Sequence, residues 1–426
     1  MGRRFSPCVR TTRGEGPSRR LFGLFFALSV FLGTTFPACA MAPRADPATG
    51  RIRVLHIGDG LWGSKPGLLL ASDPKLDVTI VPVITVWYTS EEISRYMRLY
   101  MPRGLDDLVK RYDLVLLGDC DASVITPMWQ QAFRDAVLDR GLGLLMTGGH
   151  RGLGGGALQK GLWKGTIVEQ ELLPVEVVTQ GQVDGPIRIR VLRPNNPLMA
   201  SIPWSTAPPL GGANEAQTKQ AAVELADDGK PTSHPILCFW DIGRGRGTAL
   251  METIHGGGDS TEAWVRDWAY WPDFVLNLVY FSTAAEVPQD PQLMHQIRSA
   301  FELYQSKLAL LGDLLNFIER FGARPAKIED GLRSVRQMKK EADRLYLKQE
   351  YQQVLDRLLE VEKRLDGLQI EAAKARKRAL LWVYLVEWMS VLATSLIVGV
   401  VIWSCLLYTS DAADEGLGVD LGGRRI

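Results

Sequence analysis

Short apolar runs alternate with amphipathic stretches over the first half of the chain. Apolar runs with little polar interruption are typical of parallel strands covered on both faces, and the stretches between them suit helices. Thr126 and Pro127 supply a cap and a first-turn residue for one such helix, which we expect to continue to about Arg140. The four runs lie at 51–59, 76–83, 112–119 and 142–147. The pattern predicts a doubly wound α/β domain over residues 51–285.

The pattern changes after Glu171, where short apolar segments are separated by prolines and glycines. These segments read as further strands. Aromatic residues then recur at near-helical spacing from Trp264 to Phe281. We expect this stretch to be a helix that closes over the sheet, with a ligand or membrane surface as the alternative. Residues 286–291 contain two prolines and are expected to form a linker.

Residues 291–378 carry an apolar stripe at spacings of three and four, with charged residues between. Such a stripe is typical of a helical hairpin or coiled coil. We expect residues 291–321 to form a helix, the chain to turn back at 322–325, and the striped segment after the turn to pack against that helix. This helical stalk is predicted to serve oligomerisation or contacts with other membrane or periplasmic proteins. The stripe comprises Ile328, Leu332, Val335, Met338, Ala342, Leu345, Val354, Leu358, Val361, Leu365 and Leu368.

Both ends of the chain carry apolar segments of a different kind. Residues 1–40 combine six arginines, an apolar run from Leu21 to Phe36 and small residues at the exit, which predicts a cleaved signal peptide. The pair Arg19 and Arg20 resembles a twin-arginine export motif, but arginines before an apolar run are also common in general secretion signals, so both export routes are possible. Residues 379–404 are largely apolar and carry no charge apart from Glu387, which predicts a transmembrane helix.

The membrane topology has two interpretations. A basic cluster at 374–378 precedes the predicted span and favours the cytoplasm for that flank, whereas the signal peptide favours an exported body. We expect the exported arrangement, with the α/β domain outside the cytoplasm. Residues 405–426 do not continue the apolar pattern, and reverse translation resembles a sequencing adapter. We therefore expect the native protein to continue differently beyond Ser404.

Charge and cysteine content exclude several function classes. The net charge is +1, which argues against nucleic acid as the main partner. Of five cysteines, only Cys120 and Cys238 fall in the expected mature body, and they give neither a metal-binding spacing nor a disulfide framework. No cofactor motif is found, because the glycines at 152–156 lack the Lys-Ser/Thr of a nucleotide loop.

Candidate chemistry gathers after the predicted strands. Open α/β sheets bind ligands at the carboxyl ends of their strands, so polar residues there are candidates for a ligand or metal site. The same aspartates commonly cap helices and turns. Cys120 is a possible nucleophile, although two flanking carboxylates would raise its pKa. The candidates are Asp59, Asp119, Asp121, Gly148, Gly149, His150 and His255.

The segment 112–156, followed by Glu-Leu-Leu-Pro-Val-Glu-Val at 171–177, resembles the class I glutamine amidotransferase-like domain. The resemblance implies a flavodoxin-like fold over about residues 51–285. Members that hydrolyse glutamine place a cysteine in Gly-x-Cys-x-Gly at a strand-to-helix turn, where backbone amides stabilise the oxyanion. Here His150 occupies that position. The family's His-x-Glu pair is also absent, since His255 is followed by glycines.

These observations predict a membrane-anchored, extracytoplasmic amidotransferase-like domain without glutaminase activity, acting as a binding or scaffolding module. The alternative is a hydrolase or amidotransferase that uses the strand-end residues His150, Cys120 and His255 with the neighbouring aspartates. In a third interpretation, the helical stalk recruits other membrane proteins.

Overall fold

The computed structural model describes residues 41–59, 65–84, 87–155, 162–254, 264–320 and 326–418. The predicted signal peptide, His255 and the whole of the expected 322–325 turn lie outside these ranges. The described residues form an α/β part (residues 41–285) followed by a helical part (residues 291–418).

An eight-stranded mixed sheet forms the centre of the α/β part. Its strand order is β2-β1-β3-β4-β10-β9-β8-β6. The first five strands are parallel and the last three are antiparallel. The strands are β1 (Ile52–Gly58), β2 (Leu76–Pro82), β3 (Leu114–Gly118), β4 (Gly143–Thr147), β6 (Arg190–Val191), β8 (Val223–Asp227), β9 (Pro235–Ile242) and β10 (Gly245–Leu250). The expected α/β class is therefore confirmed, with an antiparallel extension.

The antiparallel extension begins at a hairpin. β9 and β10 are joined by Gly243 and Arg244 alone, and Gly243 has a positive φ of 59°. A connection this short can only reverse the chain, because parallel strands need a long crossover. A separate two-stranded sheet pairs β5 (Val175–Ile187) with β7 (Leu210–Thr218).

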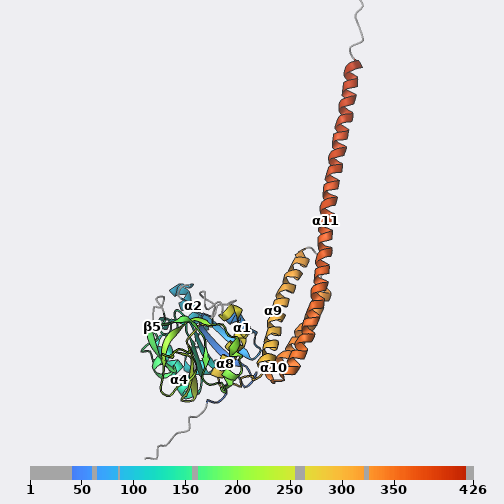
Figure 1. Ribbon diagram of the computed structural model, residues 1–426. Helices are drawn as coiled ribbons and strands as arrows, with labels where there is room; N and C mark the ends of the chain where they lie inside the picture. Colours follow the sequence, from blue (N-terminus) through green and yellow to red (C-terminus); the bar gives the residue numbers. More distant parts are fainter. Residues whose placement is uncertain are drawn as a thin grey trace, which may run out of the picture. The chain divides into compact units, whose positions relative to one another are not determined.

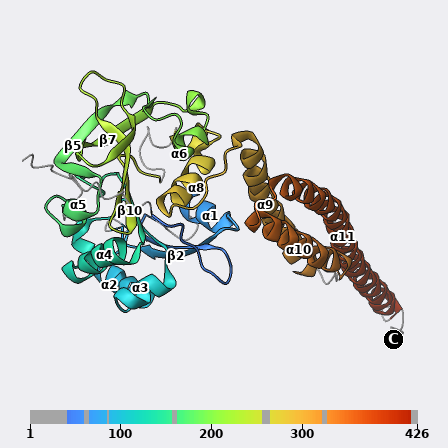
Figure 2. The same ribbon diagram turned by 90° about the horizontal axis from the view of Figure 1, so that it is seen from below.

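Helices lie on both faces of the sheet (Figures 1 and 2). α3 (Leu105–Arg111) and α4 (Pro127–Arg140) adjoin on one face, and α1 (Lys65–Ser72) and α8 (Trp271–Ser282) adjoin on the other. The remaining short elements are α2 (Ser90–Tyr100), η1 (Ala122–Val124), α5 (Ile167–Glu171), α6 (Pro197–Ala200) and η2 (Trp204–Thr206). α4 has the predicted bounds, with Thr126 at the N-cap position and Pro127 in the first turn, although the Thr126 side chain makes no capping hydrogen bond.

The aromatic stretch forms a buried cluster, as predicted. Trp264, Trp268 and Phe274 pack with ring centroids 4.7–6.2 Å apart, and Trp204 joins them from η2. Every side chain of α8 from Asp273 to Ser282 is buried. The helix therefore closes the sheet core rather than presenting a surface.

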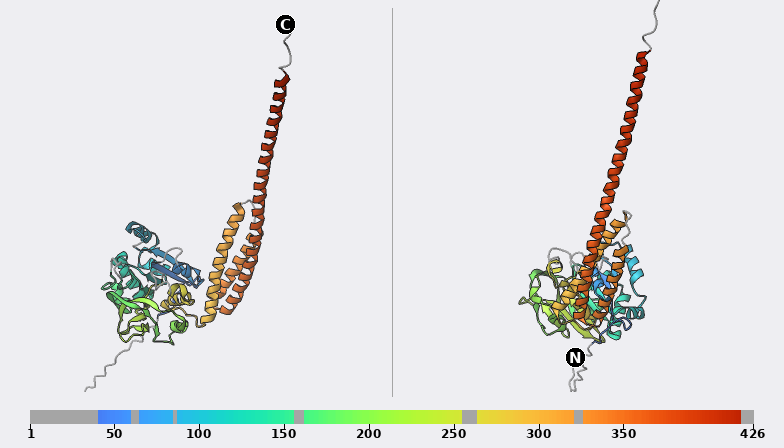
Figure 3. Two further views of the ribbon diagram at one scale, coloured as in Figure 1. Left: turned by 45° about the horizontal axis from the view of Figure 1, so that its top comes forward. Right: turned by 90° about the vertical axis from the view of Figure 1, so that its right-hand side faces the viewer.

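Three helices make up the helical part: α9 (Pro291–Arg320), α10 (Ala326–Leu347) and α11 (Tyr351–Gly418). α11 contacts both α9 and α10, and the ribbons run alongside one another in both views of Figure 3. Apolar residues from all three helices form two shared clusters. Every residue of the predicted stripe is buried or partly buried in these clusters.

The distal part of α11 differs from the packed part. Among the described residues, one helix is long and apolar enough to cross a membrane, and it is this one. Its large apolar side chains from Trp388 to Tyr408 are exposed, with values between 50% and 80%. Burial of such a surface in lipid is favourable, so the helix could span a bilayer.

A buried polar cluster joins the α/β part to the helical part. Asp73 accepts hydrogen bonds through Oδ2 from the hydroxyl groups of Tyr280 (2.5 Å) and Tyr346 (2.9 Å). The two hydroxyl oxygens are 3.2 Å apart. Burial raises the pKa of both tyrosines, so each keeps its proton and remains a donor at neutral pH. The carboxylate thus connects α8 to α10.

We predict that Leu365→Ala destabilises the helical part by about 2–5 kcal/mol, because it leaves a cavity in the cluster shared by α9, α10 and α11. Leu365 is fully buried. The matched control is Leu359→Ala on the same helix, where the side chain is 52% exposed and the expected change is within about 0.5 kcal/mol. Urea unfolding followed by circular dichroism measures both, and equal effects would contradict the packing described.

Candidate functional site

The carboxyl ends of β1, β3 and β4 bring most of the predicted site residues together. Gly58 pairs with Gly118, and Gly118 pairs with Thr147. The residues that follow these strands, Asp59, Asp119 and Gly148, therefore lie at the same edge of the sheet. This edge is where open α/β sheets bind ligands.

The turn after β4 occupies the position of the expected catalytic turn. Gly149 has a φ of 124°, a conformation that side chains other than glycine rarely adopt. A Cβ at this position would also lie 2.5 Å from Oδ1 of Asp119. Glycine is therefore required by both backbone conformation and space. The residue after it, His150, is exposed.

Asp119 closes this turn from the neighbouring strand end. Its Oδ1 accepts hydrogen bonds from the backbone N–H groups of Arg151 (2.5 Å) and Gly152 (3.0 Å), and its Oδ2 accepts one from the Arg151 guanidinium (3.2 Å). Asp119 itself is 4% exposed and has a φ of 44°. An observed left-handed backbone at a non-glycine residue is strained, so the surrounding contacts must hold it. The carboxylate fills the space in front of the turn's amides.

Burial raises the pKa of Asp119 above its ordinary value. The hydrogen bond from the Arg151 amide opposes this shift, and the nearby charge of Asp59 adds to it. The hydrogen bonds to Asp119 favour its charged form. The cost of removing the carboxylate from water is larger, so its pKa rises overall.

The amides of Gly148 and Gly149 also have internal partners. Gly148 donates to the carbonyl oxygen of Leu250 at 2.7 Å. Gly149 donates to Oδ1 of Asn214 at 2.8 Å, and Asn214 donates back to the Gly149 carbonyl at 3.2 Å. Asn214 belongs to β7, far away in sequence. The turn is thus held by hydrogen bonds from β10, β7 and the end of β3.

A buried histidine lies beneath this edge and was not among the predicted residues. Nε2 of His56 is 2.8 Å from Oδ1 of Asp59, and both side chains have no exposed surface. Within the described ranges, Nδ1 of His56 and Oδ2 of Asp59 have no hydrogen-bond partner. The signal in the sequence was a histidine inside a mostly apolar strand.

Cys120 and Asp121 have structural surroundings. Cys120 is fully buried, and burial raises the pKa of its thiol well above the ordinary value, with Asp121 and Asp119 adding to the shift. Its carbonyl oxygen accepts a hydrogen bond from the Trp163 indole at 2.7 Å. Oδ1 of Asp121 accepts one from the Ser123 amide at 2.8 Å and caps η1. A buried, protonated thiol is a poor nucleophile.

His255 lies outside the described residues, so its relation to this edge stays a prediction. Across the ranges that the structure describes, no group of three or more His, Cys, Asp or Glu side chains is arranged to hold a metal ion.

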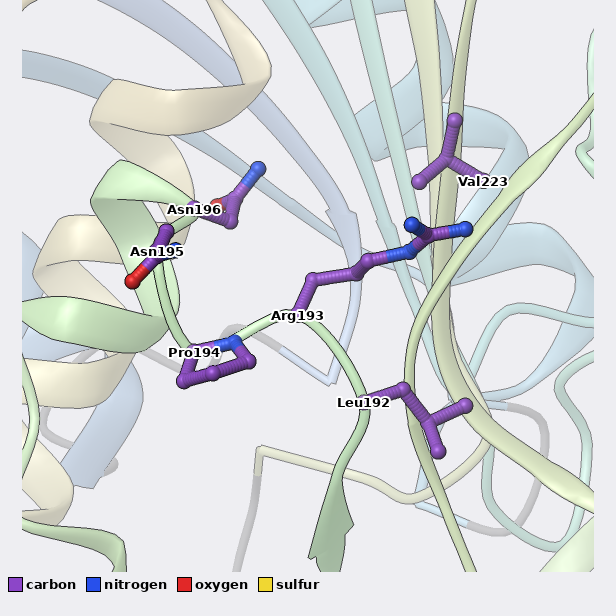
Figure 4. A pocket seen from close by; sticks show the side chains of 6 residues that line it. All are labelled: Leu192, Arg193, Pro194, Asn195, Asn196 and Val223. Atoms are coloured by element: carbon purple, nitrogen blue, oxygen red, sulfur yellow. The ribbon is translucent and has the colours of Figure 1, made fainter.

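Three hollows on the surface contain none of the predicted site residues. One, of about 540 Å³, lies at the loop 192–196 beside Val223 of β8, and Figure 4 shows Arg193 extending across it toward that valine. A second, of about 430 Å³, lies beside Lys164 and Lys219. The third, of about 620 Å³, is lined by α1, the segment 265–276 and α9.

Comparison with known proteins leaves the family open. No family model and no curated protein matches the chain. Two solved cytoplasmic proteins from Salmonella typhimurium are similar to 54% of this chain, at 19% and 18% identity with TM-scores of 0.44 and 0.45, over 98% and 99% of their own lengths. An exo-beta-1,4-mannosidase from an Opitutaceae bacterium is 12% identical over 55% of this chain and 36% of its own, with a TM-score of 0.26. Similarity at this level supports no statement about activity.

We predict that Cys120 reacts with a thiol reagent at neutral pH at least about 100-fold more slowly than free cysteine, because it is buried and its pKa is raised. The measurement is mass spectrometry of the alkylated peptide over time. The same peptide labelled in urea is the control. Rapid labelling of the folded protein would show that the thiol is accessible and would reopen its candidacy as a nucleophile.

We predict that Asp119→Asn gains stability relative to the wild type as pH rises. A raised pKa means that the folded state binds the proton more tightly than the unfolded state, so the wild type loses stability as pH rises from about 3.8 through the folded-state pKa. Asparagine does not titrate, so the variant does not lose stability in this way. Melting temperatures of both proteins between pH 3 and pH 7 measure it. If the melting temperature of the variant instead falls relative to that of the wild type as pH rises, the hydrogen bonds to the charged carboxylate outweigh the cost of burying it.

Proposed function

We propose that this chain is a membrane-anchored, extracytoplasmic glutamine amidotransferase-like module that binds or scaffolds and does not hydrolyse glutamine. One observation carries the proposal. The Arg151 amide, which follows the position of the nucleophile, donates to the Asp119 carboxylate at 2.5 Å. In hydrolases with such a turn, the amide of the residue after the nucleophile stabilises the oxyanion.

Two further features support the loss of activity. His150 stands where the hydrolases of this fold have cysteine. The second amide, that of Gly152, also donates to Asp119. An anionic intermediate at this place would meet a carboxylate instead of free donors, and loss of a single oxyanion donor already costs about 100-fold to 1,000-fold in rate.

The fold assignment within this proposal rests on strand order. The five parallel strands run in the order β2-β1-β3-β4-β10, which is the order of flavodoxin-like sheets. The residues that resemble amidotransferases span β3, α4, β4 and the turn after it. The alternative activity, a hydrolase using the strand-end cluster, would need a nucleophile there, and the thiol of Cys120 is buried.

The membrane part of the proposal rests on the exposed apolar length of α11 together with the predicted signal peptide. An anchored module outside the cytoplasm would present its α/β part to periplasmic or membrane partners, and the packed helices α9, α10 and α11 would offer a contact surface. No nucleic acid and no cofactor are part of this proposal.

We predict that the purified protein releases no ammonia from glutamine, and that His150→Cys also fails to do so, because the Arg151 amide remains occupied by Asp119. An ammonia-coupled assay measures this, with an active glutaminase of the same fold as positive control. Glutamine hydrolysis by the wild type that is lost in His150→Ala, or clear activity in His150→Cys, would contradict the proposal.

For the topology, we expect an impermeant amine-reactive reagent to label lysines of the α/β part in intact spheroplasts that express the full chain. A cytoplasmic protein labelled only after lysis is the control. If the α/β part also labels only after lysis, the exported arrangement is wrong, and the basic cluster at 374–378 marks the cytoplasmic side of an uncleaved chain.

A further inference from the structure

The basic cluster at residues 374–378 lies where α11 leaves the packed helices. Among the described residues of α11, Ala379 is the last one with a buried side chain. Leu381 and Trp382, which follow it, are 60% and 68% exposed. Figure 1 shows α11 continuing beyond the end of α9. The cluster therefore marks the boundary between the packed part of α11 and its exposed apolar part.

The bases of this cluster are exposed and have no carboxylate partner. Elsewhere in the packed helices bases are paired, as Lys307 is with Glu362 at 2.9 Å and with Asp366 at 2.6 Å. In the part of the chain that the structure describes, no carboxylate lies within salt-bridge distance of any base of the cluster. The Arg376 guanidinium lies over the ring of Phe317, 5.0 Å from its centroid. The exposed bases are Lys374, Arg376, Lys377 and Arg378.

The charge along α11 changes sign near this boundary. Residues 360–366 contain two basic and three acidic residues, whereas residues 371–378 contain four basic residues and one acidic residue. The next acidic residue after Glu371 is Glu387. A local excess of positive charge next to an apolar helix is complementary to a surface that is both anionic and apolar.

The ends of α9 and α10 reach the same level of the bundle, because Ile318 and Ile328 pack in one cluster with Ala372. Each of these ends has an exposed base close to an exposed acid, so the excess of positive charge comes from α11. These neighbours are Arg320 beside Glu319, and Lys327 near Glu329.

Aromatic residues place the two edges of the apolar part. Trp382 and Tyr384 follow the basic cluster and are 68% and 56% exposed, and Trp403 is 66% exposed. Trp403 comes 21 residues after Trp382, which is about 32 Å along an α-helix. That length matches a hydrocarbon layer about 30 Å thick, and Trp and Tyr are enriched at both of its interfaces. With Trp382 at one interface, residues 374–378 lie at the level of the lipid phosphates.

We propose that residues 374–378 bind the headgroups of anionic phospholipids, such as phosphatidylglycerol, in the leaflet nearest the packed helices. This inference rests on the membrane-anchored part of the proposed function, and it holds for either topology. An arginine can donate two parallel hydrogen bonds to a phosphate, and lysine adds a compact charge. The long side chains allow both to reach the headgroups. A zwitterionic headgroup attracts the cluster less, because its net charge is zero.

The test measures lipid binding to the full chain in a non-ionic detergent by native mass spectrometry. The two probes are phosphatidylglycerol and phosphatidylcholine with the same acyl chains, so they differ only in the headgroup. We expect the first phosphatidylglycerol to bind at least about tenfold more tightly than the first phosphatidylcholine. The reason is that each basic residue near an anionic headgroup contributes about fivefold.

Two matched double variants locate the effect. Lys377→Gln with Arg378→Gln removes half of the cluster's charge, and it should lower the preference for phosphatidylglycerol at least about fivefold. Lys363→Gln with Arg364→Gln is the control, because it removes the same exposed Lys-Arg pair from α11, 14 residues earlier and about 21 Å further from the apolar part. The control should keep the preference within about twofold. Melting curves confirm that both variants are folded.

A competition measurement separates a lipid from a free phosphate ester. Glycerol 3-phosphate carries the charged phosphate without acyl chains, and we expect it not to displace phosphatidylglycerol at equal concentration. Displacement at equal concentration would show that the cluster reads free phosphate esters, and it would reject the lipid as the occupant.

Flotation with phosphatidylcholine vesicles tests the anchor separately. A chain that does not float with these vesicles contradicts both the membrane-anchored function and this inference. A chain that floats but binds the two lipids equally tightly overturns this inference alone. It is also overturned if the two double variants lower the preference equally, because the effect would then reflect the total charge of α11.

Discussion

The Asp119 carboxylate determines what the strand-end region of this protein can do. It reaches across from the end of β3 to two amides of the turn after β4, and a left-handed backbone at Asp119 sets that reach. The absence of a Cβ at Gly149 leaves room for it. Because the carboxylate is nearly completely buried, its hydrogen bonds are shielded from competing water. The same geometry that stabilises the turn occupies the amides of Arg151 and Gly152.

A second constraint is the buried polar contact between the α/β part and the helical part. Asp73, Tyr280 and Tyr346 share hydrogen bonds, and Arg298 pairs with Asp273 nearby. Breaking a buried pair by removing one partner is costly, because the other is left desolvated. Movement of α9 or α10 relative to α8 would therefore disturb these groups. The third hollow lies beside these groups, where the hydrogen bonds of Asp73 and the ion pair between Arg298 and Asp273 hold α1, α8 and α9 together.

The pattern of apolar residues was sufficient to predict the strands β1, β2, β3 and β4, because a strand that is buried on both faces is a continuous apolar run. It was also sufficient to predict the stripe on α10 and α11, because a helix that is buried on one face has apolar residues at spacings of three and four. It placed Asp59 and Asp119 correctly after their strands. It could not show that Asp119 turns inward, because that depends on a backbone angle and on the register between β3 and β4. Asn214 and His56 were missed because β7 is polar and distant in sequence, and a single histidine in a strand has no periodic signature.

Asp119 occupies the amides of Arg151 and Gly152, and hydrogen exchange at these two amides measures that occupancy. Mass spectrometry with residue-level fragmentation can follow them in the wild type and in Asp119→Ala. The account predicts that both amides exchange slowly in the wild type and at least about tenfold faster in the variant, while the Gly148 amide, which donates to Leu250, stays protected in both. Fast exchange of Arg151 and Gly152 in the wild type would contradict the account, because it would show amides free to bind an oxyanion.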